Sequence, residues 1–218
     1  MNCKRNLAFA IPALSLLLVL SAQQAGTAVG WYNGEWRSGV PGLPNWYATA
    51  DRFARVYDQF QVPDGGWTVA AVFSDNGSPD PQTIVNASWE IRRGMAPGDG
   101  GEIVASGVAP AVQAPDPSVT AKRYPAAEVP RHFRITVENM RLFLPAGHYW
   151  LSVTPLGDEK LHVSATAGGN AVGLDGNGPG MALFDSPGGP RFAIAEATGR
   201  AGQVGVARHF SQGVIVAR

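Results

Sequence analysis

Apolar and polar residues alternate with a period of two along much of the chain. In residues 83–92 the apolar set falls on one face, and the polar set, which includes Glu90 and Arg92, falls on the other. Because a β-strand points successive side chains to opposite faces, this pattern predicts a half-buried strand with its charges in solvent. Comparable patterns predict strands at residues 53–62, 67–73, 102–106, 132–140 and 160–166, and short closing strands near residues 181–184, 191–195, 204–210 and 214–217.

The same alternation assigns the side chains that face the core. They are the apolar residues at every second position of the predicted strands, among them Val56, Phe60, Val62, Trp67, Val69, Ala71, Phe73, Val85, Ala87, Trp89, Ile91, Phe133, Ile135 and Val137. One polar residue, Asp58, interrupts this set on an otherwise apolar face.

Two segments, residues 60–69 and 142–153, share a local pattern. Each has an aliphatic residue, a proline, any residue, a glycine and then an aromatic residue that opens an alternating strand. Proline presets φ and glycine tolerates positive φ, so each segment predicts a strand, a tight turn and a second strand. In the second segment Tyr149 is expected in the core. Trp150, on the opposite face, is expected to be covered by the N-terminal aromatic segment or a long loop, and by a ligand only if neither covers it.

Two matching corners predict an all-β fold, an antiparallel two-sheet β-sandwich. The composition agrees, because 27 glycines, 17 prolines and only 16% charged residues are typical of short strands joined by many turns. Residues 94–101 predict the loop of a long antiparallel hairpin. The proline-rich residues 109–130 are either an extended crossover between the two sheets or a surface loop.

The N-terminus has the layout of a secretory signal peptide. Lys4 and Arg5 precede an apolar segment of about 14 residues, which is shorter than the roughly 20 residues of a membrane-spanning helix. We therefore predict a signal peptide at residues 1–28, with an earlier cleavage near Ala22 as the alternative, and a single domain at residues 29–218. The domain is expected in the periplasm or outside the cell, with no membrane anchor after cleavage.

The single cysteine, Cys3, lies within the predicted signal peptide. The exported domain would then carry no thiol, which excludes thiolate metal sites and cysteine nucleophiles, and its core alone would have to stabilise it. Basic and acidic residues balance at 17 each, so no basic surface for nucleic acid is expected.

The segment of residues 29–50 is rich in tryptophan and fits neither a helical nor a strand period. Its rings either pack across the sandwich or form a stacking platform for sugar rings, since a flat aromatic face matches the C–H face of a pyranose. The candidate ligand-binding residues are Trp31, Trp36, Trp46, Tyr47 and, from the second corner, Trp150.

Two loops carry oxygen-bearing residues that could bind Ca²⁺. The first contains Asp75, Asn76 and Asp80, which turn chemistry alone also explains. The second is the glycine-rich loop of residues 167–180, where Asp175 and Asn177 resemble the start of an EF-hand. A proline at the third ligand position and the lack of the final glutamate exclude a true EF-hand. A looser Ca²⁺ site or a flexible loop remain the alternatives.

No constellation of residues predicts catalysis. The four histidines are scattered singly, and neither an H-E-x-x-H nor a G-x-S-x-G motif occurs. A hydrolase or lyase acting on polysaccharide would need two carboxylates, or a histidine and a carboxylate, at one cleft. The sequence favours a protein that is not an enzyme, and it nominates no catalytic residue.

Three motifs carry a resemblance over roughly residues 57–153. They are F-Q-V-P-D-G-G-W at residues 60–67, I-R-R-G-M-A-P-G-D-G-G at residues 91–101 and L-P-A-G-H-Y-W-L-S-V at residues 144–153. With them the chain resembles exported bacterial β-sandwich domains of the cleaved-adhesin and PEP-CTERM surface-protein kind. The resemblance implies a jelly-roll fold. The sorting helix that many such proteins carry at the C-terminus is not found, and no catalytic residue carries over.

These observations together predict an exported, non-enzymatic β-sandwich module that binds glycan or extracellular matrix or is structural. A polysaccharide-acting hydrolase or lyase and a Ca²⁺-stabilised structural module are the alternatives. No cofactor other than Ca²⁺ is suggested by the sequence.

Overall fold

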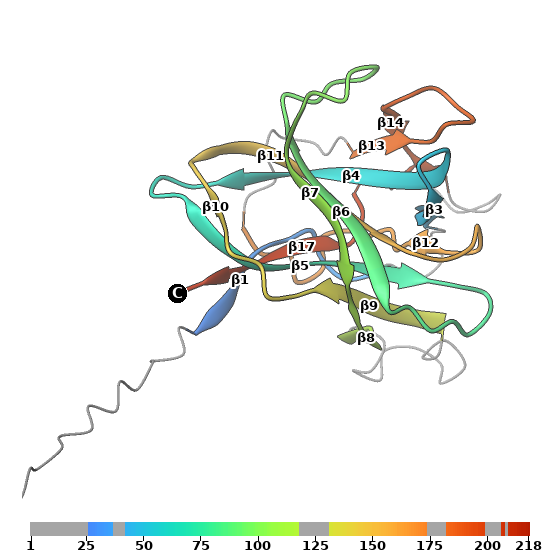
Figure 1. Ribbon diagram of the computed structural model, residues 1–218, viewed down its shortest axis with the longest axis horizontal. Coiled ribbons are helices and arrows are strands. Elements are labelled where there is room, and N and C mark those ends of the chain that lie inside the picture. Colours follow the sequence, from blue (N-terminus) through green and yellow to red (C-terminus); the bar gives the residue numbers. More distant parts are fainter. Residues whose placement is uncertain (1–25, 37–41, 118–130, 174–181, 199–205, 208) are drawn as a thin grey trace, which may run out of the picture.

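The computed structural model describes residues 26–36, 42–117, 131–173, 182–198, 206–207 and 209–218 (Figure 1). The regular elements of these residues are all β-strands, and every strand pairing is antiparallel. The strands form two large sheets and one small pair. The prediction of an all-β chain with two antiparallel sheets is confirmed, and the arrangement fits a β-sandwich.

The first sheet is built around the long strand β5. Along its main path it contains β1 (Thr27–Tyr32), β17 (Gln212–Ala217), β5 (Trp67–Gly77), β12 (His162–Val163) and β2 (Leu43–Pro44). Along its other side, β5 pairs with β9 (His132–Val137) and β10 (Leu142–Leu144). Strand β9 in turn pairs with β8 (Val112–Pro115).

The second sheet is built around β4 and β11. Its order is β14 (Ala193–Ala195), β13 (Ala182–Asp185), β4 (Arg52–Val62), β11 (Gly147–Pro155), β6 (Asn86–Arg93) and β7 (Glu102–Pro110), with β3 (Trp46–Thr49) also paired to β4. The strands β15 (Ala197–Thr198) and β16 (Val206–Ala207) form the small pair.

The two predicted corners connect the sheets and lie side by side (Figure 1). One passes from β4 to β5, and the other passes from β10 to β11. Leu144 pairs with Trp67 in the first sheet, and Gly147 pairs with Val62 in the second, so each corner runs along the other. Gly66 has a φ of 74°, and a Cβ there would lie 2.7 Å from the carbonyl oxygen of Leu144. The prediction that these segments turn tightly between strands is confirmed.

The main core lies between the two sheets, and Phe60 is at the centre of its aromatic contacts. The Phe60 ring stacks with Trp31 at 5.2 Å, with Trp67 at 6.2 Å and with Tyr149 at 5.7 Å. The predicted core residues of β9 and β11 are buried there: Phe133, Ile135, Val137, Tyr149, Leu151 and Val153.

A β-bulge in β5 reverses the alternation that the sequence predicts. Ile215 pairs with Ala71 and Val216 pairs with Val69, so Ala70 is an extra residue. Beyond the bulge Val72 faces the core, while Phe73 pairs with Thr136 on the outer face. Ala71 and Phe73 are therefore buried, but on the outer face of the first sheet and not in the core between the sheets, where the alternation placed them.

Strand β5 also extends further than the sequence predicts. It continues to Gly77, so Asp75 and Asn76 lie within a strand and are fully buried, not in an exposed turn. The long pairing with β9 extends the strand past the predicted turn residues. The alternation of apolar and polar residues could not show that the strand continues to Gly77, because the polar residues at the end of β5 resemble a loop.

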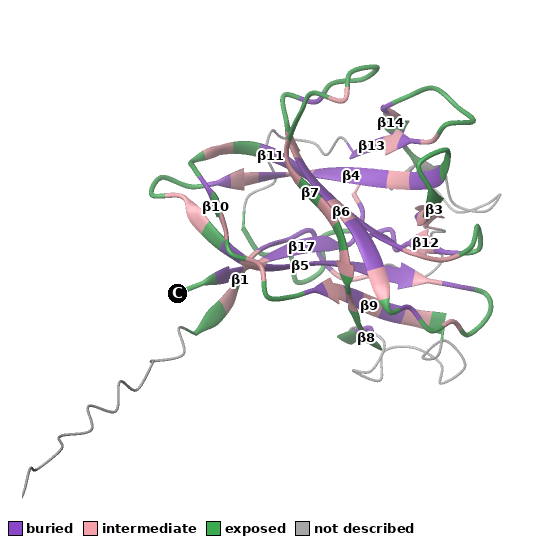
Figure 2. Ribbon diagram, viewed as in Figure 1, coloured by how far each residue is buried: buried purple, intermediate pink, exposed green. Residues whose placement is uncertain are grey.

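Strand β6 is buried on both faces, which corrects a second prediction. Glu90 and Arg92 were expected in solvent, but Glu90 is only 7% exposed and the Arg92 side chain only 12%. Val85, expected in the core, precedes the strand and is 62% exposed. Figure 2 shows the buried residues along β4, β6 and β11.

A second apolar cluster covers the outer face of the second sheet and explains this burial. Its members are Tyr57, Met95, Trp150, Leu183 and Phe192. Met95 comes from the loop between β6 and β7, so a long loop covers Trp150 together with β13 and the segment before β14. A sheet covered on both faces cannot display the simple alternation of a half-buried sheet.

Candidate functional site

The outer face of the second sheet carries arginine side chains held between aromatic rings. The Arg55 guanidinium lies 5.0 Å from the centre of the Tyr47 ring and 4.8 Å from that of Phe53. Arg191 lies 5.9 Å from the Phe53 ring and 5.2 Å from the Phe192 ring. Such cation–π contacts contribute about 0.5–2 kcal/mol each, depending on how far they are desolvated.

A third arginine completes the series. Arg92 lies 5.4 Å from the Phe192 ring and 5.5 Å from the Tyr57 ring. The side chains thus alternate in the order Tyr47, Arg55, Phe53, Arg191, Phe192, Arg92 and Tyr57, and we call this series the arginine ladder. Because its members come from β3, β4, β6 and the segment before β14, the ladder fastens distant parts of the chain to one sheet face.

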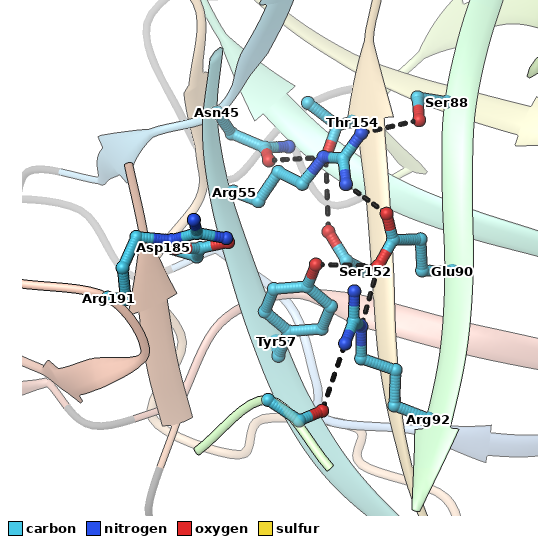
Figure 3. A network of polar contacts seen from close by, with 11 residues as sticks. Asn45, Arg55, Tyr57, Ser88, Glu90, Arg92, Ser152, Thr154, Asp185 and Arg191 are labelled. Carbon is cyan, nitrogen blue, oxygen red and sulfur yellow. Dashed lines mark hydrogen bonds and ion pairs between the residues drawn. The ribbon is translucent and has the colours of Figure 1, made fainter. Parts of the chain in front are cut away.

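Glu90 is the carboxylate that holds two arginines of the ladder (Figure 3). It accepts hydrogen bonds from Arg55, from Arg92 Nε at 2.6 Å and from the Tyr57 hydroxyl at 2.8 Å. Arg55 also donates to Ser88 Oγ at 3.0 Å, and Arg92 to the carbonyl oxygen of Gly100 at 3.0 Å. The carboxylate is therefore neutralised and has its hydrogen-bonding capacity filled by protein groups.

Asp185 holds the remaining arginine of the ladder. Arg191 donates to it through Nε and through Nη2, the latter at 2.9 Å. Asp185 lies opposite Arg55 in the pairing of β13 with β4, but its side chain is 2% exposed. Glu90 and Asp185 thus lie on one sheet face, and each is closed off by its own arginine partner.

Tyr57 cannot act as a base in this network. Burial, and after it the negative charge of Glu90, raise the pKa of the Tyr57 hydroxyl far above its ordinary value. The phenol therefore stays protonated and acts as a hydrogen-bond donor to Glu90. With both carboxylates neutralised, the arginine ladder is a stabilising brace and does not have the open carboxylate pair that a glycosidase needs.

On the outer face of the first sheet, Asp75 is likewise a buried carboxylate paired with an arginine that lies against an aromatic ring. Arg134 donates to Asp75 through Nε at 2.6 Å and Nη2 at 2.8 Å, and its guanidinium lies 3.9 Å from the Phe73 ring centre. The Tyr32 hydroxyl and Ser211 Oγ also donate to Asp75, at 2.8 and 2.7 Å. Asp75 therefore links β1, β5, β9 and the residue just before β17, and it is unsuited to bind Ca²⁺.

A histidine that lines one small cavity lies close to a buried carboxylate. Asp58 accepts from the backbone N–H groups of Phe210 at 2.7 Å and Gln59 at 3.1 Å, and His209 Nδ1 lies 3.8 Å from its Oδ1. Burial raises the pKa of the Asp58 carboxyl, an effect that His209 opposes. The two backbone hydrogen bonds and the nearby histidine explain how Asp58 is tolerated on an apolar face. The sequence pattern could not explain it.

His209 lines this cavity, together with Trp31, Asn33 and the loop of residues 167–173. The volume is about 200 Å³, below the roughly 300–1,000 Å³ typical of ligand pockets. The Asp58 side chain is 2% exposed and does not line the cavity, so the two groups do not both reach it. The pair is therefore a weak basis for an enzyme.

Two of the aromatic residues predicted to bind ligand are buried. Trp31 is 1% exposed and belongs to the core between the sheets, where it stacks on Phe60. Trp150 is 3% exposed under the second apolar cluster. Neither ring presents a face to solvent on which a sugar could stack.

The other three predicted residues are half-buried and do not form one surface. Trp36 stacks on the His132 ring at 3.9 Å, beside the first sheet. Trp46 packs against the main core, and Tyr47 lies at one end of the arginine ladder. The structure therefore separates the predicted platform into parts that face different directions.

The predicted Ca²⁺ residues Asp175 and Asn177 lie outside the described residues. Within the described ranges, no group of three or more histidine, cysteine, aspartate and glutamate side chains is placed to hold a metal ion. The described part of the chain also contains no helix that is long and apolar enough to cross a membrane.

An open groove of about 770 Å³ lies on the outer face of the first sheet. Its floor is made of small side chains of β5, including Thr68, Ala70 and Ala71, at the position of the β-bulge. One wall is the segment between β9 and β10, which donates from Met140 N to the carbonyl oxygen of Ala70 at 2.9 Å. The full lining is Thr27, Thr68, Ala70, Ala71, Glu138, Asn139, Met140, Arg141, Ile215 and Ala217.

An exposed aromatic ring lies on the same face as this groove. Phe143 is 59% exposed and pairs directly with Thr68, so the two side chains point to the same side of the sheet. Arg141, two residues earlier, lines the groove. The sequence did not reveal this site, because the groove residues come from β1, β5, β17 and the segment between β9 and β10 and share no motif.

Comparison of the chain with protein-family models, with curated proteins and with solved structures finds no match. The site must therefore be interpreted from its own geometry.

Proposed function

We propose that the protein is a non-enzymatic binding module that acts outside the cytoplasm and holds a glycan in the groove beside Phe143. The observation that supports this most directly is an open groove of ligand size with an exposed aromatic ring on the same sheet face. The glycan assignment retains the sequence-based expectation, but it moves the stacking residue from the tryptophan-rich segment to Phe143.

The lining of the groove suits a hydroxyl-rich ligand. Small side chains on the floor let a ring approach the sheet closely, and the exposed Glu138, Asn139 and Arg141 supply acceptors and donors along one wall. Glu138 and Arg141 carry opposite charges, so the wall has no net charge to favour a strongly ionic ligand. A neutral polysaccharide segment is the ligand class that this chemistry fits best.

Replacing Phe143 with alanine should weaken glycan binding about tenfold, because a stacked ring contributes on the order of 1 kcal/mol beyond its buried area. The ligand would first be identified on a glycan array, and affinities of both proteins would then be measured by calorimetry. Ile194→Ala, which truncates a side chain of similar exposure on β14, is the matched control.

Phe143 is largely exposed, so its loss should leave the melting temperature almost unchanged. Equal glycan affinities for wild type and Phe143→Ala would refute the groove as the binding site. Absence of binding to every neutral glycan on the array would refute the proposed ligand class.

We also propose that the two-sheet fold is a jelly roll preceded by a signal peptide. The paired corners at β4–β5 and β10–β11 support the first part, since long strands folded together across two sheets are typical of jelly rolls. The charged and apolar segments at residues 1–20 support the second.

The position of β1 bears on where the signal peptide would be cleaved. Thr27 pairs with Ala217 and Ala28 pairs with Val216, so cleavage after Ala28 would remove two paired residues from the edge of the first sheet. We expect cleavage near Ala22, which leaves the strand intact. Intact-mass measurement of the exported protein checks this, and a mature chain that begins at Val29 would contradict it.

A further inference from the structure

Both sheets end on the same side of the sandwich, in consecutive strands. Strand β7 is the last strand of the second sheet, and it leads through Ala111 into β8, the last strand of the first sheet on that side (Figure 1). In the described residues β7 pairs only with β6 and β8 only with β9. We call the outward edge of β7 and β8 the open edge.

Exposed apolar side chains gather at the open edge. Of the eight large apolar residues that are exposed in the described chain, three lie on the two strands of this edge: Ile103 and Val108 on β7 and Val112 on β8. The core-facing residues nearest the edge, Trp89, Val104, Ala109 and Ala111, are only half-buried although they pack against the main core. The main core is thus least covered at the open edge, and a further strand there would cover it.

The open edge also lacks the features that usually prevent strand pairing. Residues 103–109 contain no charged residue and no proline. A bulge at Val104 and the proline at position 110 limit regular pairing to Ala105–Ala109, a segment of five residues. The exposed ion pair between Arg93 and Glu102 lies beyond this segment.

We propose that the open edge binds a second copy of this chain, with β7 of each copy paired antiparallel about a two-fold axis at Gly107. In this register Ser106 lies opposite Val108 of the partner copy and Ala105 lies opposite Ala109, so residues that meet share a sheet face. The segment is uncharged, so two copies do not repel each other, whereas a charged partner strand would find no complementary charge.

Trp89 gives a further reason for a strand beyond β7. It pairs with Gly107, and a Cβ at Gly107 would lie 3.2 Å from the indole Nε1, so the ring lies over the glycine. A half-buried indole that lies over the edge strand gains buried area when a further strand is added beside that strand. A partner β7 would supply that cover.

The dimer would hold two grooves at once. The groove lies over β5, β17 and β1 of the first sheet and is walled by the segment between β9 and β10, while the proposed pairing is at β7, the end strand of the second sheet. Pairing at β7 therefore leaves both grooves accessible. A dimer with two grooves binds a repetitive glycan more tightly than one module, through effective concentration.

The test is the oligomeric state of the exported protein, measured by light scattering on a sizing column between about 1 and 100 µM, the range of ordinary protein affinities. Wild type is expected to show a dimer. Val108→Lys should raise the dissociation constant at least tenfold, because it places a charge at the paired segment. Ile194→Lys is the matched control, since Ile194 is 51% exposed on β14, the opposite edge strand of the same sheet.

A dimer that Val108→Lys dissociates and Ile194→Lys preserves would support the proposal. Wild type that is monomeric throughout this range would overturn it, as would a dimer that both variants affect equally. Ser106→Lys provides an independent change at the paired segment, and melting temperatures confirm that each variant is folded. None of these outcomes depends on glycan binding, so the result stands apart from the proposed function.

Discussion

Replacing Glu90 with glutamine is expected to lower the free energy of unfolding by about 3–5 kcal/mol, the usual cost of breaking a buried ion pair. The Glu90 side chain is 10% exposed and accepts from Arg55, Arg92 and Tyr57. A glutamine has no charge, and its amide N–H₂ group would point at these donors. Two guanidinium groups would be left against the sheet without a counter-charge.

Thermal unfolding followed by circular dichroism measures this effect. A loss of this size should lower the melting temperature by about 10 °C in a domain of this length. Glu102→Gln is the matched control, because the Arg93–Glu102 pair is exposed on both sides and should contribute less than about 1 kcal/mol. Similar melting temperatures for the two variants would show that the arginine ladder does not stabilise the fold.

Replacing Asp75 with asparagine should be comparably destabilising, by about 3–5 kcal/mol. Asp75 is fully buried and accepts four hydrogen bonds, two from Arg134 and one each from Tyr32 and Ser211. An asparagine offers one acceptor oxygen, so at least one buried donor loses its partner and the Arg134 charge is no longer balanced.

The Asp75 variant should also loosen a particular part of the molecule. Asp75 holds Tyr32 of β1 and Ser211 just before β17, so backbone amides of these two strands should lose hydrogen-exchange protection first. Denaturant unfolding gives the free energy, and Asp80→Asn, which breaks the exposed Lys160–Asp80 pair, is the control. A change in protection spread evenly over both sheets would contradict the assigned role of Asp75.

The two networks together explain a gap in the sequence-based prediction. Alternation of apolar and polar residues identifies strands well but assigns charged residues to solvent. Here Asp75 and Glu90 are charged residues in strands, and both are buried because arginine and tyrosine side chains from other strands reach them. Those partners lie between 33 and 59 positions away in sequence, so no local pattern could reveal them.

The candidate site was predicted less well than the fold. The aromatic-rich segment drew attention to Trp31, which forms part of the core. The groove was invisible in the sequence, because its shape depends on the bulge at Ala70 and on small side chains that have no chemical signature. The only sequence signal was that Phe143 is a large apolar residue on the outward-facing side of β10, the strand that precedes the second corner.

The sequence by itself determined the all-β class, the two proline–glycine corners and most of the strands, because backbone dihedrals and the two-residue period are local properties. Tertiary structure alone decided which faces are covered. The segment from β13 to β14 folds over the second sheet and buries Trp150, and the bulge in β5 shifts Phe73 to the outer face. Burial depends on which distant strands become neighbours, and that is set by the packing of the whole chain.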